Sequence, residues 1–300
     1  MQTVLITGGT GAVGLATSML LERQGYKVIH LSRRADLSAR FPAYSWDLGK
    51  QFIDKKALEQ ADFIIHLAGT GIADARWSKS RKTDIIASRV DSSLLLAKNL
   101  AAVEKRPLFF IGASATGFYG NRGTEILTET SSAGTGFLSE SCQLWENSYQ
   151  AIRDLNINCD VLRIGIVLAA HSGALAKMLP SYKLRLGAYF GNGAQMYSWI
   201  HIQDLARIFL FLVQNTPQNQ TYNATAPTPV SNYELANTIA TALGKKSLIA
   251  PVPAFALRLA MGEMADVVLH GANVVPENLQ KAGFEFLYPT VLAALENLLK

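Results

Sequence analysis

The stretch Thr7-Gly8-Gly9-Thr10-Gly11-Ala12-Val13-Gly14 decides the fold. It follows the apolar run Thr3–Thr7, which predicts a buried parallel strand, and it opens a helix predicted over Gly14–Gln24. Glycines at this spacing let the backbone turn tightly, approach a pyrophosphate and pack the helix closely on the strand. The helix N-terminus adds amide donors for an anion. We therefore predict a dinucleotide site formed by Gly8, Thr10, Gly11, Ala12, Val13 and Gly14.

Strands and helices alternate beyond this loop. A second strand at Lys27–Leu31 completes a βαβ unit. Further strands are predicted at Phe63–Leu67, Pro107–Ile111 and Asn158–Val167, with helices at Ser80–Ala102 and Leu138–Leu155 between them. This alternation predicts an α/β protein with a doubly wound parallel sheet of the Rossmann type.

The alternation loosens after about residue 168. The remaining sequence predicts a Gly-rich loop at Gly187–Gly193, a strand at Tyr197–Ile202, a helix from Asp204 and a terminal helix at Thr290–Leu299. We expect an NADP-binding Rossmann domain at residues 1–168 and a smaller α/β substrate lobe at residues 169–300. Some segments of the lobe are expected to return to the sheet.

Composition narrows the class of protein. Hydrophobic residues make up 49% of the 300 residues and charged residues 17%, enough apolar surface for a large core. The net charge is +5, but the basic residues are scattered, which argues against nucleic-acid binding. The two cysteines, Cys142 and Cys159, have no metal-ligand spacing and favour a reducing, cytoplasmic compartment. No apolar stretch approaches a membrane span and no signal peptide is recognisable, so we expect a soluble protein without a metal site.

The end of the second strand favours NADP(H) over NAD(H). Sites that prefer NAD usually carry an acidic residue here, which binds the ribose 2′-hydroxyl. This chain instead has Ser32, Arg33 and Arg34, whose hydroxyl and guanidiniums suit a 2′-phosphate. Alternatively, Arg33 and Arg34 are solvated surface residues without a ligand. Asp36 is close enough in sequence to replace the missing acidic residue.

Two further segments are expected along the cofactor. Asp47 and Leu48 follow a predicted third strand at Tyr44–Trp46; Asp47 either meets the adenine or caps the following turn. The next strand ends in His66-Leu67-Ala68-Gly69, where small residues let the backbone pass beneath the cofactor. Leu67, Ala68 and Gly69 are therefore assigned to the cofactor site, and His66 is interpreted as a structural residue.

With these motifs in place, the chain resembles the extended short-chain dehydrogenase/reductase superfamily, of the NAD(P)-dependent epimerase/dehydratase type. The resemblance covers nearly the whole length and is carried by segments 7–14, 66–69, 114–120 and 198–207. Segments 76–82, 142–146, 222–227 and 261–264 further resemble an uncharacterised subgroup called epimerase family, sometimes labelled cell-division inhibitor.

The resemblance implies a catalytic Ser with a Tyr-x-x-x-Lys pair, in which the Lys lowers the pKa of the Tyr and holds the nicotinamide ribose. Ser114, expected just after its strand, matches the Ser. Alignment on Glu146 places Leu138 at the Tyr position and Cys142 at the Lys position, and neither transfers a proton in the usual way. The standard mechanism is therefore in question.

Several side chains are candidate substitutes. Tyr119 lies near Ser114 and is proposed with it as catalytic, although packing is its alternative role. The weaker candidates are Tyr149 with Arg153, whose guanidinium holds its proton too tightly, and the carboxyls of Glu129 and Glu146. Arg163 and Gly165 resemble the superfamily segment that passes near the nicotinamide. In the second lobe, Lys177–Pro180, Gly191–Gln195, Ser198 and His201 stand where relatives bind a nucleotide-sugar, and His201 is expected to cap the helix that follows.

Two functions remain open at this point. One is an NADP(H)-dependent oxidoreductase, epimerase or dehydratase acting on an unknown small polar, sugar-nucleotide-like substrate. The other is a non-catalytic NADP(H)-binding regulator, for example one related to cell division, which the missing pair favours. Relatives are often dimers through two long helices, so a homodimer through Ser80–Ala102 and Leu138–Leu155 is a candidate assembly.

Overall fold

A central sheet organises the computed structural model, which describes residues 1–215 and 218–300. Its eight strands have the order β13-β8-β6-β5-β1-β2-β3-β4 and are parallel except for β4. The strands are β1 (Thr3–Thr7), β2 (Lys27–Ser32), β3 (Ala43–Asp47), β4 (Phe52–Ile53), β5 (Phe63–His66), β6 (Phe109–Ala115), β8 (Asn158–Ile164) and β13 (Thr221–Ala224). The predicted fold class is confirmed.

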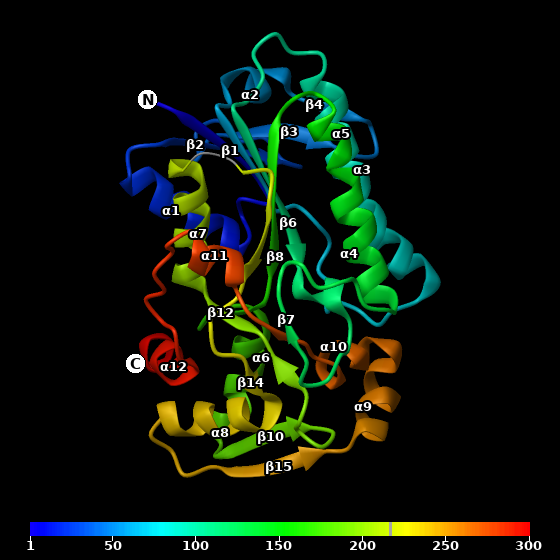
Figure 1. Ribbon diagram of the computed structural model, residues 1–300, viewed down its shortest axis with the longest axis vertical. Helices are drawn as coiled ribbons and strands as arrows, with labels where there is room; N and C mark the ends of the chain where they lie inside the picture. Colours follow the sequence, from blue (N-terminus) through cyan, green and yellow to red (C-terminus); the bar gives the residue numbers. More distant parts are fainter. Residues whose placement is uncertain (216–217) are drawn as a thin grey trace.

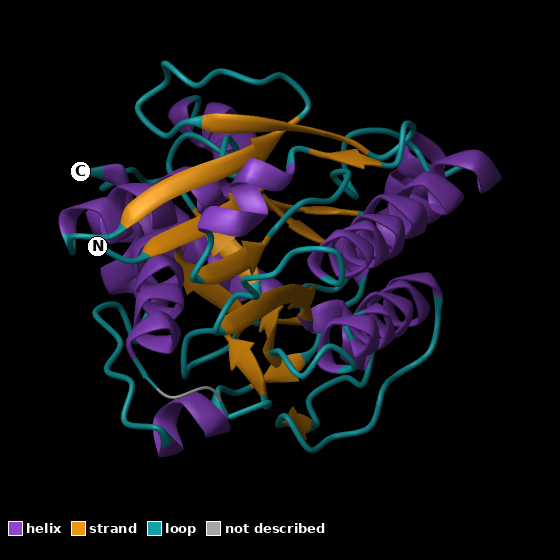
Figure 2. Ribbon diagram, turned by 90° about the horizontal axis from the view of Figure 1, so that it is seen from above, coloured by secondary structure: helices purple, strands orange, loops and turns teal. Residues whose placement is uncertain are grey.

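Helices cover both faces of this sheet (Figures 1 and 2). One face carries α2 (Lys55–Gln60), α3 (Lys79–Leu100), α4 (Phe137–Ser148) and α5 (Gln150–Arg153). The other carries α1 (Ala12–Arg23), α7 (Ile202–Gln214) and α11 (Glu277–Lys281). Successive β1 residues point to opposite faces, so Leu5 packs under α3 while Val4 and Ile6 pack under α1 and α7. This two-sided burial explains why the strand is apolar throughout.

The smaller lobe lies below the sheet in Figure 1 and has its own core around Trp199. Its short strand pairs are β10 (Leu186–Phe190) with β15 (Leu248–Val252), β11 (Met196–Tyr197) with β14 (Val230–Ser231), β12 (Trp199–His201) with β9 (Ile166–Leu168), and β16 (Asn273–Val274) with β7 (Ile126–Leu127). Its helices are α6 (Gly173–Lys183), α8 (Asn232–Ala242), α9 (Ala254–Met261), α10 (Asp266–Leu269) and α12 (Val291–Leu299). Two 3-10 turns, η1 (Thr116–Tyr119) and η2 (Gly262–Ala265), complete the elements.

Part of the second half of the chain lies in the central sheet. Strand β13 pairs in parallel with β8 and forms the sheet edge, and α7 packs on the sheet beside α1. The proposed boundary at residue 168 stays a prediction, because β9, which ends there, pairs with β12 of the following half.

Several predicted boundaries were wrong. The single strand expected at Asn158–Val167 is two strands, because at Gly165 the chain passes so close to Ser198 that a Cβ would lie 2.5 Å from its carbonyl oxygen. The expected loop at Gly187–Gly193 contains β10, and the helix expected at Leu138–Leu155 is divided at Tyr149. Ser114 lies within β6 rather than after it.

Candidate active site

The glycine loop lies at the carboxyl end of β1, where the strand order reverses between β2 and β5. Open α/β sheets bind ligands at such a point. Gly8 has a φ of +69°, and a Cβ on Gly14 would lie 2.4 Å from the Gly8 carbonyl oxygen. No larger residue therefore fits at Gly14 without moving backbone. Helix α1 begins at Ala12, so its N-terminus directly follows this turn.

The predicted Leu67-Ala68-Gly69 turn lies against the glycine loop. A Cβ on Gly8 would lie 3.1 Å from the Leu67 backbone. Thr7 Oγ1 accepts hydrogen bonds of 3.1 Å from the amides of both Leu67 and Ala68, so the ends of β1 and β5 are tied together. The cofactor residues predicted from these two segments thus share one edge of the sheet.

His66 has the contacts of a structural residue. Its ring is fully buried, with Nδ1 2.7 Å from Thr7 Oγ1 and Nε2 3.0 Å from Ser92 Oγ. Burial lowers its pKa to about 3, so the imidazole is neutral at physiological pH.

Arg33 and Arg34 follow β2 and are exposed, and neither side chain has a partner within residues 1–215 and 218–300. Asp36 uses its carboxylate locally, since Oδ1 accepts bonds from Ser38 and from the Ala39 amide. The serine bonds lower the pKa of Asp36. One oxygen of this carboxylate is therefore engaged within its own turn.

Asp47 and Leu48 lie at the end of β3. Oδ1 of Asp47 accepts a 3.1 Å bond from the Lys50 amide, as expected for the turn-capping alternative. Leu48 is half-buried against the core under α3. Their contact with an adenine stays a prediction.

Ser114, Leu138 and Cys142 come together at the carboxyl end of β6. A Cβ on Gly117, in the following turn, would lie 3.4 Å from Leu138 Cβ and 3.7 Å from Cys142 Sγ. The Ser114 side chain also interacts with the Cys142 thiol. Burial raises the pKa of Cys142 to about 11, so the thiol is neutral. The places expected for Tyr and Lys are thus filled by an apolar side chain and a neutral thiol.

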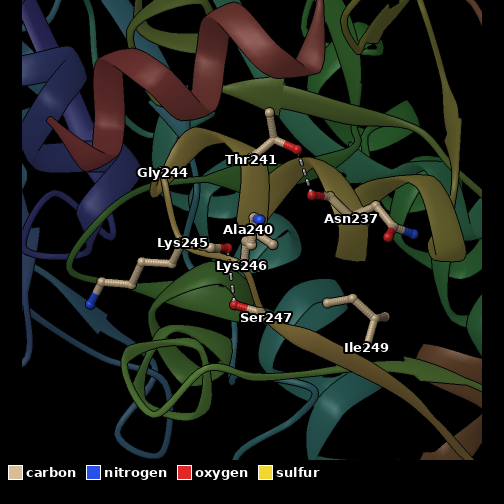
Figure 3. A pocket seen from close by; sticks show the side chains of 8 residues that line it. All are labelled: Asn237, Ala240, Thr241, Gly244, Lys245, Lys246, Ser247 and Ile249. Carbon is tan, nitrogen blue, oxygen red and sulfur yellow. Dashed lines mark hydrogen bonds between the residues drawn. The ribbon is translucent and has the colours of Figure 1, made fainter.

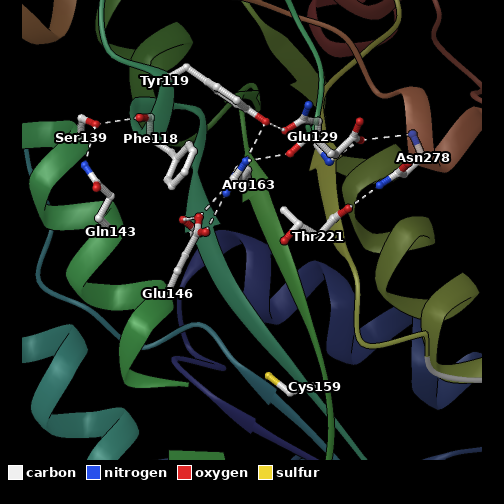
Figure 4. Close-up of polar contacts among 12 residues, drawn as sticks. Phe118, Tyr119, Glu129, Ser139, Gln143, Glu146, Cys159, Arg163, Thr221 and Asn278 are labelled. Atoms are coloured by element: carbon white, nitrogen blue, oxygen red, sulfur yellow. Dashed lines mark hydrogen bonds and ion pairs between the residues drawn. The ribbon is translucent and has the colours of Figure 1, made fainter. Parts of the chain in front are cut away.

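Ser114 belongs to a buried polar network, of which Figure 4 labels Glu146, Arg163, Phe118 and Tyr119. Its Oγ donates a 2.6 Å bond to Glu146 Oε1, and Arg163 binds the same carboxylate at 2.9 and 2.8 Å. The Arg163 guanidinium also lies 3.4 Å from the Phe118 ring centroid and donates to the Tyr119 hydroxyl at 3.0 Å. Because these partners occupy its donors, the predicted cofactor role of Arg163 stays a prediction.

The other candidate proton donors are also held by the fold. Tyr119 is fully buried and donates a 2.7 Å bond to Asn223 Oδ1, and burial raises its pKa. Tyr149 is buried and donates to the Ala113 carbonyl at 2.6 Å. Oε1 of Glu129 accepts from the amides of Asn223 and Asn278, and burial raises the pKa of this carboxyl. The catalytic assignment of Tyr119 therefore stays a prediction.

In the second lobe, most of the predicted ligand residues have structural contacts. His201 caps α7 as predicted, since Nδ1 accepts a 3.0 Å bond from the Gln203 amide. Ser198 is buried and bonds to the backbone of Ala272 and Val274. Lys177 donates across the lobes to the Ala73 carbonyl at 3.4 Å. Among the residues described, no cluster of three or more His, Cys, Asp or Glu could hold a metal, and no helix is long and apolar enough to cross a bilayer.

Two motifs from distant parts of the sequence, residues 76–82 and 261–264, contact each other. Lys82 pairs with Glu263, and Arg76 lies 3.2 Å from where a Cβ on Gly262 would be. The Lys82 ammonium also lies 5.1 Å from the ring of Phe137, the residue before Leu138. The loop before α3 and the turn η2 thus lie beside the site.

A shallow pocket elsewhere has a different character (Figure 3). It lies at the end of α8 and is lined by Asn237, Ala240, Thr241, Gly244, Lys245, Lys246, Ser247 and Ile249. The C-terminus of a helix carries partial negative charge and disfavours a bound anion, and lysines placed after it offset that charge. This pocket shares no residue with the sheet edge.

Two side chains near the site, Arg89 and Asn223, were not predicted from the sequence. Arg89 lies mid-helix in α3, where a basic residue usually faces solvent, and no motif surrounds it. Asn223 lies 104 residues from its partner Tyr119. It falls in a subgroup segment, but no local signal indicates this pairing.

Comparison with known proteins identifies the family. Residues 4–225 match the model described as NAD dependent epimerase/dehydratase family. The chain belongs to that family. Residues 252–298 match a second model, a domain of unknown function called DUF1731.

Relatives share this organisation from end to end. "Epimerase family protein ML0860" of Mycobacterium leprae is 33% identical over 97% of this chain and 94% of its own length. The chloroplastic SDR39U1 homolog of Arabidopsis thaliana is 33% identical over 100% of this chain and 87% of its own. The structure of human SDR39U1 with NADPH has a TM-score of 0.88 and 28% identity, and the match covers 99% of both chains. These relatives are called epimerase family proteins; a cell-division role stays a prediction.

Proposed function

We propose that the protein is an NADP(H)-dependent oxidoreductase or epimerase that acts on a small polar carbonyl or sugar-like compound. The observation that carries the proposal is the pair Arg33 and Arg34, which are exposed beside the glycine loop and unpaired among the residues described, while Asp36 Oδ1 is engaged in its own turn. Two guanidiniums without a competing carboxylate suit a 2′-phosphate. The human relative crystallised with NADPH supports this choice.

The residues present fit such a cofactor. The positive φ of Gly8 and the close packing of Gly14 on it give the strand–turn–helix geometry that a pyrophosphate-binding loop requires. The cofactor would supply hydride transfer. In this proposal the Ser114 oxygen accepts a hydrogen bond from a substrate hydroxyl, because its own proton is donated to Glu146 and that bond orients the serine.

Fluorescence titration with NADPH and NADH tests the cofactor. Wild type should prefer NADPH, and Arg33→Ala/Arg34→Ala should weaken NADPH binding about 10- to 100-fold, since hydrogen bonds to charged groups contribute about 1.5–3 kcal/mol each. Arg23→Ala/Lys98→Ala removes the same charge from exposed sites at helix ends and is the matched control. Failure of wild type to bind either nucleotide would contradict the proposal.

A screen of carbonyl compounds for NADPH oxidation separates the two functions. Hydride transfer to any member supports the enzyme. The replacement of Tyr and Lys by Leu138 and Cys142 favours the alternative, an NADP(H)-binding regulator. Tight NADPH binding without hydride transfer, together with a persistent protein partner in a pull-down, would support that alternative.

A further inference from the structure

Arg89 reaches from α3 to the turn that follows β5. A Cβ on Gly69 would lie 3.2 Å from Cζ of Arg89, so the guanidinium lies directly against this turn. The preceding residue pair, Leu67 and Ala68, packs on Gly8 of the glycine loop. Arg89 therefore lies next to the cofactor edge, on the side toward α4.

This guanidinium is a half-buried cation with no anionic partner among residues 1–215 and 218–300. Nη1 donates to the carbonyls of Thr70 and Ile85 at 3.0 and 2.9 Å, and Cζ lies 4.9 Å from the Trp145 ring centroid. Within the described parts of the chain no carboxylate lies at ion-pair distance, and neither Nε nor Nη2 makes a hydrogen bond. These two nitrogens are therefore free to donate to a ligand.

The neighbouring side chains cannot supply a counter-charge. Cys142 and Tyr149 are titratable groups near Arg89 that would be anionic if they lost a proton. Burial raises the pKa of both, to about 11 for the thiol. Both are neutral at physiological pH. Arg81, which also acts on Arg89, is a second cation. None of these three groups supplies a counter-charge, and an anionic or hydroxyl-rich ligand would match the free guanidinium nitrogens.

Arg89 lies against Trp145 of α4, about one helical turn after Cys142, and Cys142 occupies the position that aligns with the lysine of the Tyr-x-x-x-Lys pair. We propose that Arg89 binds the nicotinamide half of NADP(H), its ribose hydroxyls and adjoining phosphate, in place of that lysine. The assignment rests on the proposed cofactor. A guanidinium keeps its proton, so Arg89 binds and orients the cofactor but does not relay protons.

Two probes that share only part of the cofactor test this role. NADPH has both halves, whereas adenosine 2′,5′-bisphosphate has the 2′-phosphate but no nicotinamide ribose. Arg89→Met should raise the Kd of NADPH about 10- to 100-fold and leave that of the bisphosphate within about twofold. Arg33→Ala/Arg34→Ala should weaken both ligands.

The outcomes distinguish this inference from the proposed function. If wild type binds neither probe, the cofactor proposal fails and this assignment fails with it. If wild type binds both and folded Arg89→Met binds NADPH equally well, only the assignment is overturned. Should Arg89→Met not fold, Arg89→Gln keeps amide donors without the charge. Selective loss of NADPH binding in that variant supports the role, and equal loss of both ligands overturns it. Lys98→Met, at the exposed end of α3, is the control.

Discussion

The Ser114 hydroxyl and the Glu146 carboxylate are joined by a 2.6 Å hydrogen bond between β6 and α4. The same carboxylate neutralises Arg163, and only 13% of the Glu146 side chain and 7% of the Arg163 side chain are exposed. One carboxylate thus links the expected catalytic serine to a buried ion pair.

Glu146→Gln should leave Arg163 buried without a counter-charge. Loss of one partner of a buried pair costs about 3–5 kcal/mol, and we expect urea denaturation to show a decrease of at least about 3 kcal/mol in the free energy of unfolding. Glu140→Gln, at an exposed position of the same helix, should change it by less than about 1 kcal/mol. Equal effects in the two variants would argue that the ion pair contributes little.

Gly14→Ala should disturb the glycine loop. The new Cβ would lie 2.4 Å from the Gly8 carbonyl oxygen and 2.7 Å from Gly9 Cα, and backbone must move to admit it. Overpacking of this kind costs about 1–3 kcal/mol, and the displaced loop should weaken NADPH binding at least about tenfold. Gly49→Ala, whose Cβ would meet only Asp47 Oδ1 at 3.4 Å, should bind NADPH like wild type. Unchanged binding by Gly14→Ala would place the cofactor elsewhere.

Tyr119→Phe separates a structural from a catalytic tyrosine. The change leaves Asn223 Oδ1 without its 2.7 Å donor, which should reduce the free energy of unfolding by about 1–3 kcal/mol. NADPH affinity should remain. Once a reducible carbonyl compound is known, a rate close to that of wild type would contradict the catalytic assignment of Tyr119. The control, Tyr233→Phe, alters an exposed ring and should be near neutral.

Stability should decrease in mild acid because of two buried histidines. Burial lowers the folded-state pKa to about 4 for His30 and about 3 for His66, from ordinary values of 6.5. The unfolded chain therefore binds more protons below pH 6.5, and stability present above that pH is lost as pH falls toward these values. From pH 7 to pH 5 the loss should be about 2 kcal/mol for each histidine.

Urea denaturation of His30→Gln at pH 7 and pH 5 measures how much of the acid-induced loss of stability is due to His30. The difference between pH 7 and pH 5 should shrink by about 2 kcal/mol relative to wild type. His171→Gln, at an exposed position, should leave the wild-type difference intact. A pH response of His30→Gln equal to that of wild type would show that the buried imidazole does not carry the effect.

The features that were predictable from sequence are those encoded locally. The glycine spacing after Thr3–Thr7 predicted both the βαβ unit and the cradle, because tight turns and close approach leave residue-level signatures. The alignment also brought Leu138 and Cys142 correctly to Ser114.

The contacts that escaped prediction join distant segments. Asn223 reaches Tyr119 because β13 joins the sheet edge beside β8, and nothing near residue 223 indicates that pairing. Arg89 has the sequence context of a surface helix residue, and its burial follows from how α3 packs against α4. Side chains whose role depends on tertiary packing leave no local pattern.

The edge position of β13 also bears on how the protein is made. On the ribosome, β8 is synthesised well before Thr221–Ala224, so its outer edge has no strand partner until that later segment emerges. The Glu129 carboxylate gains its hydrogen bond from the Asn278 amide only after residue 278 has been synthesised. An unpaired parallel strand edge is prone to association with other chains. We expect nascent chains stalled before residue 221 to require a chaperone. In the complete chain, β13 pairs with the outer edge of β8.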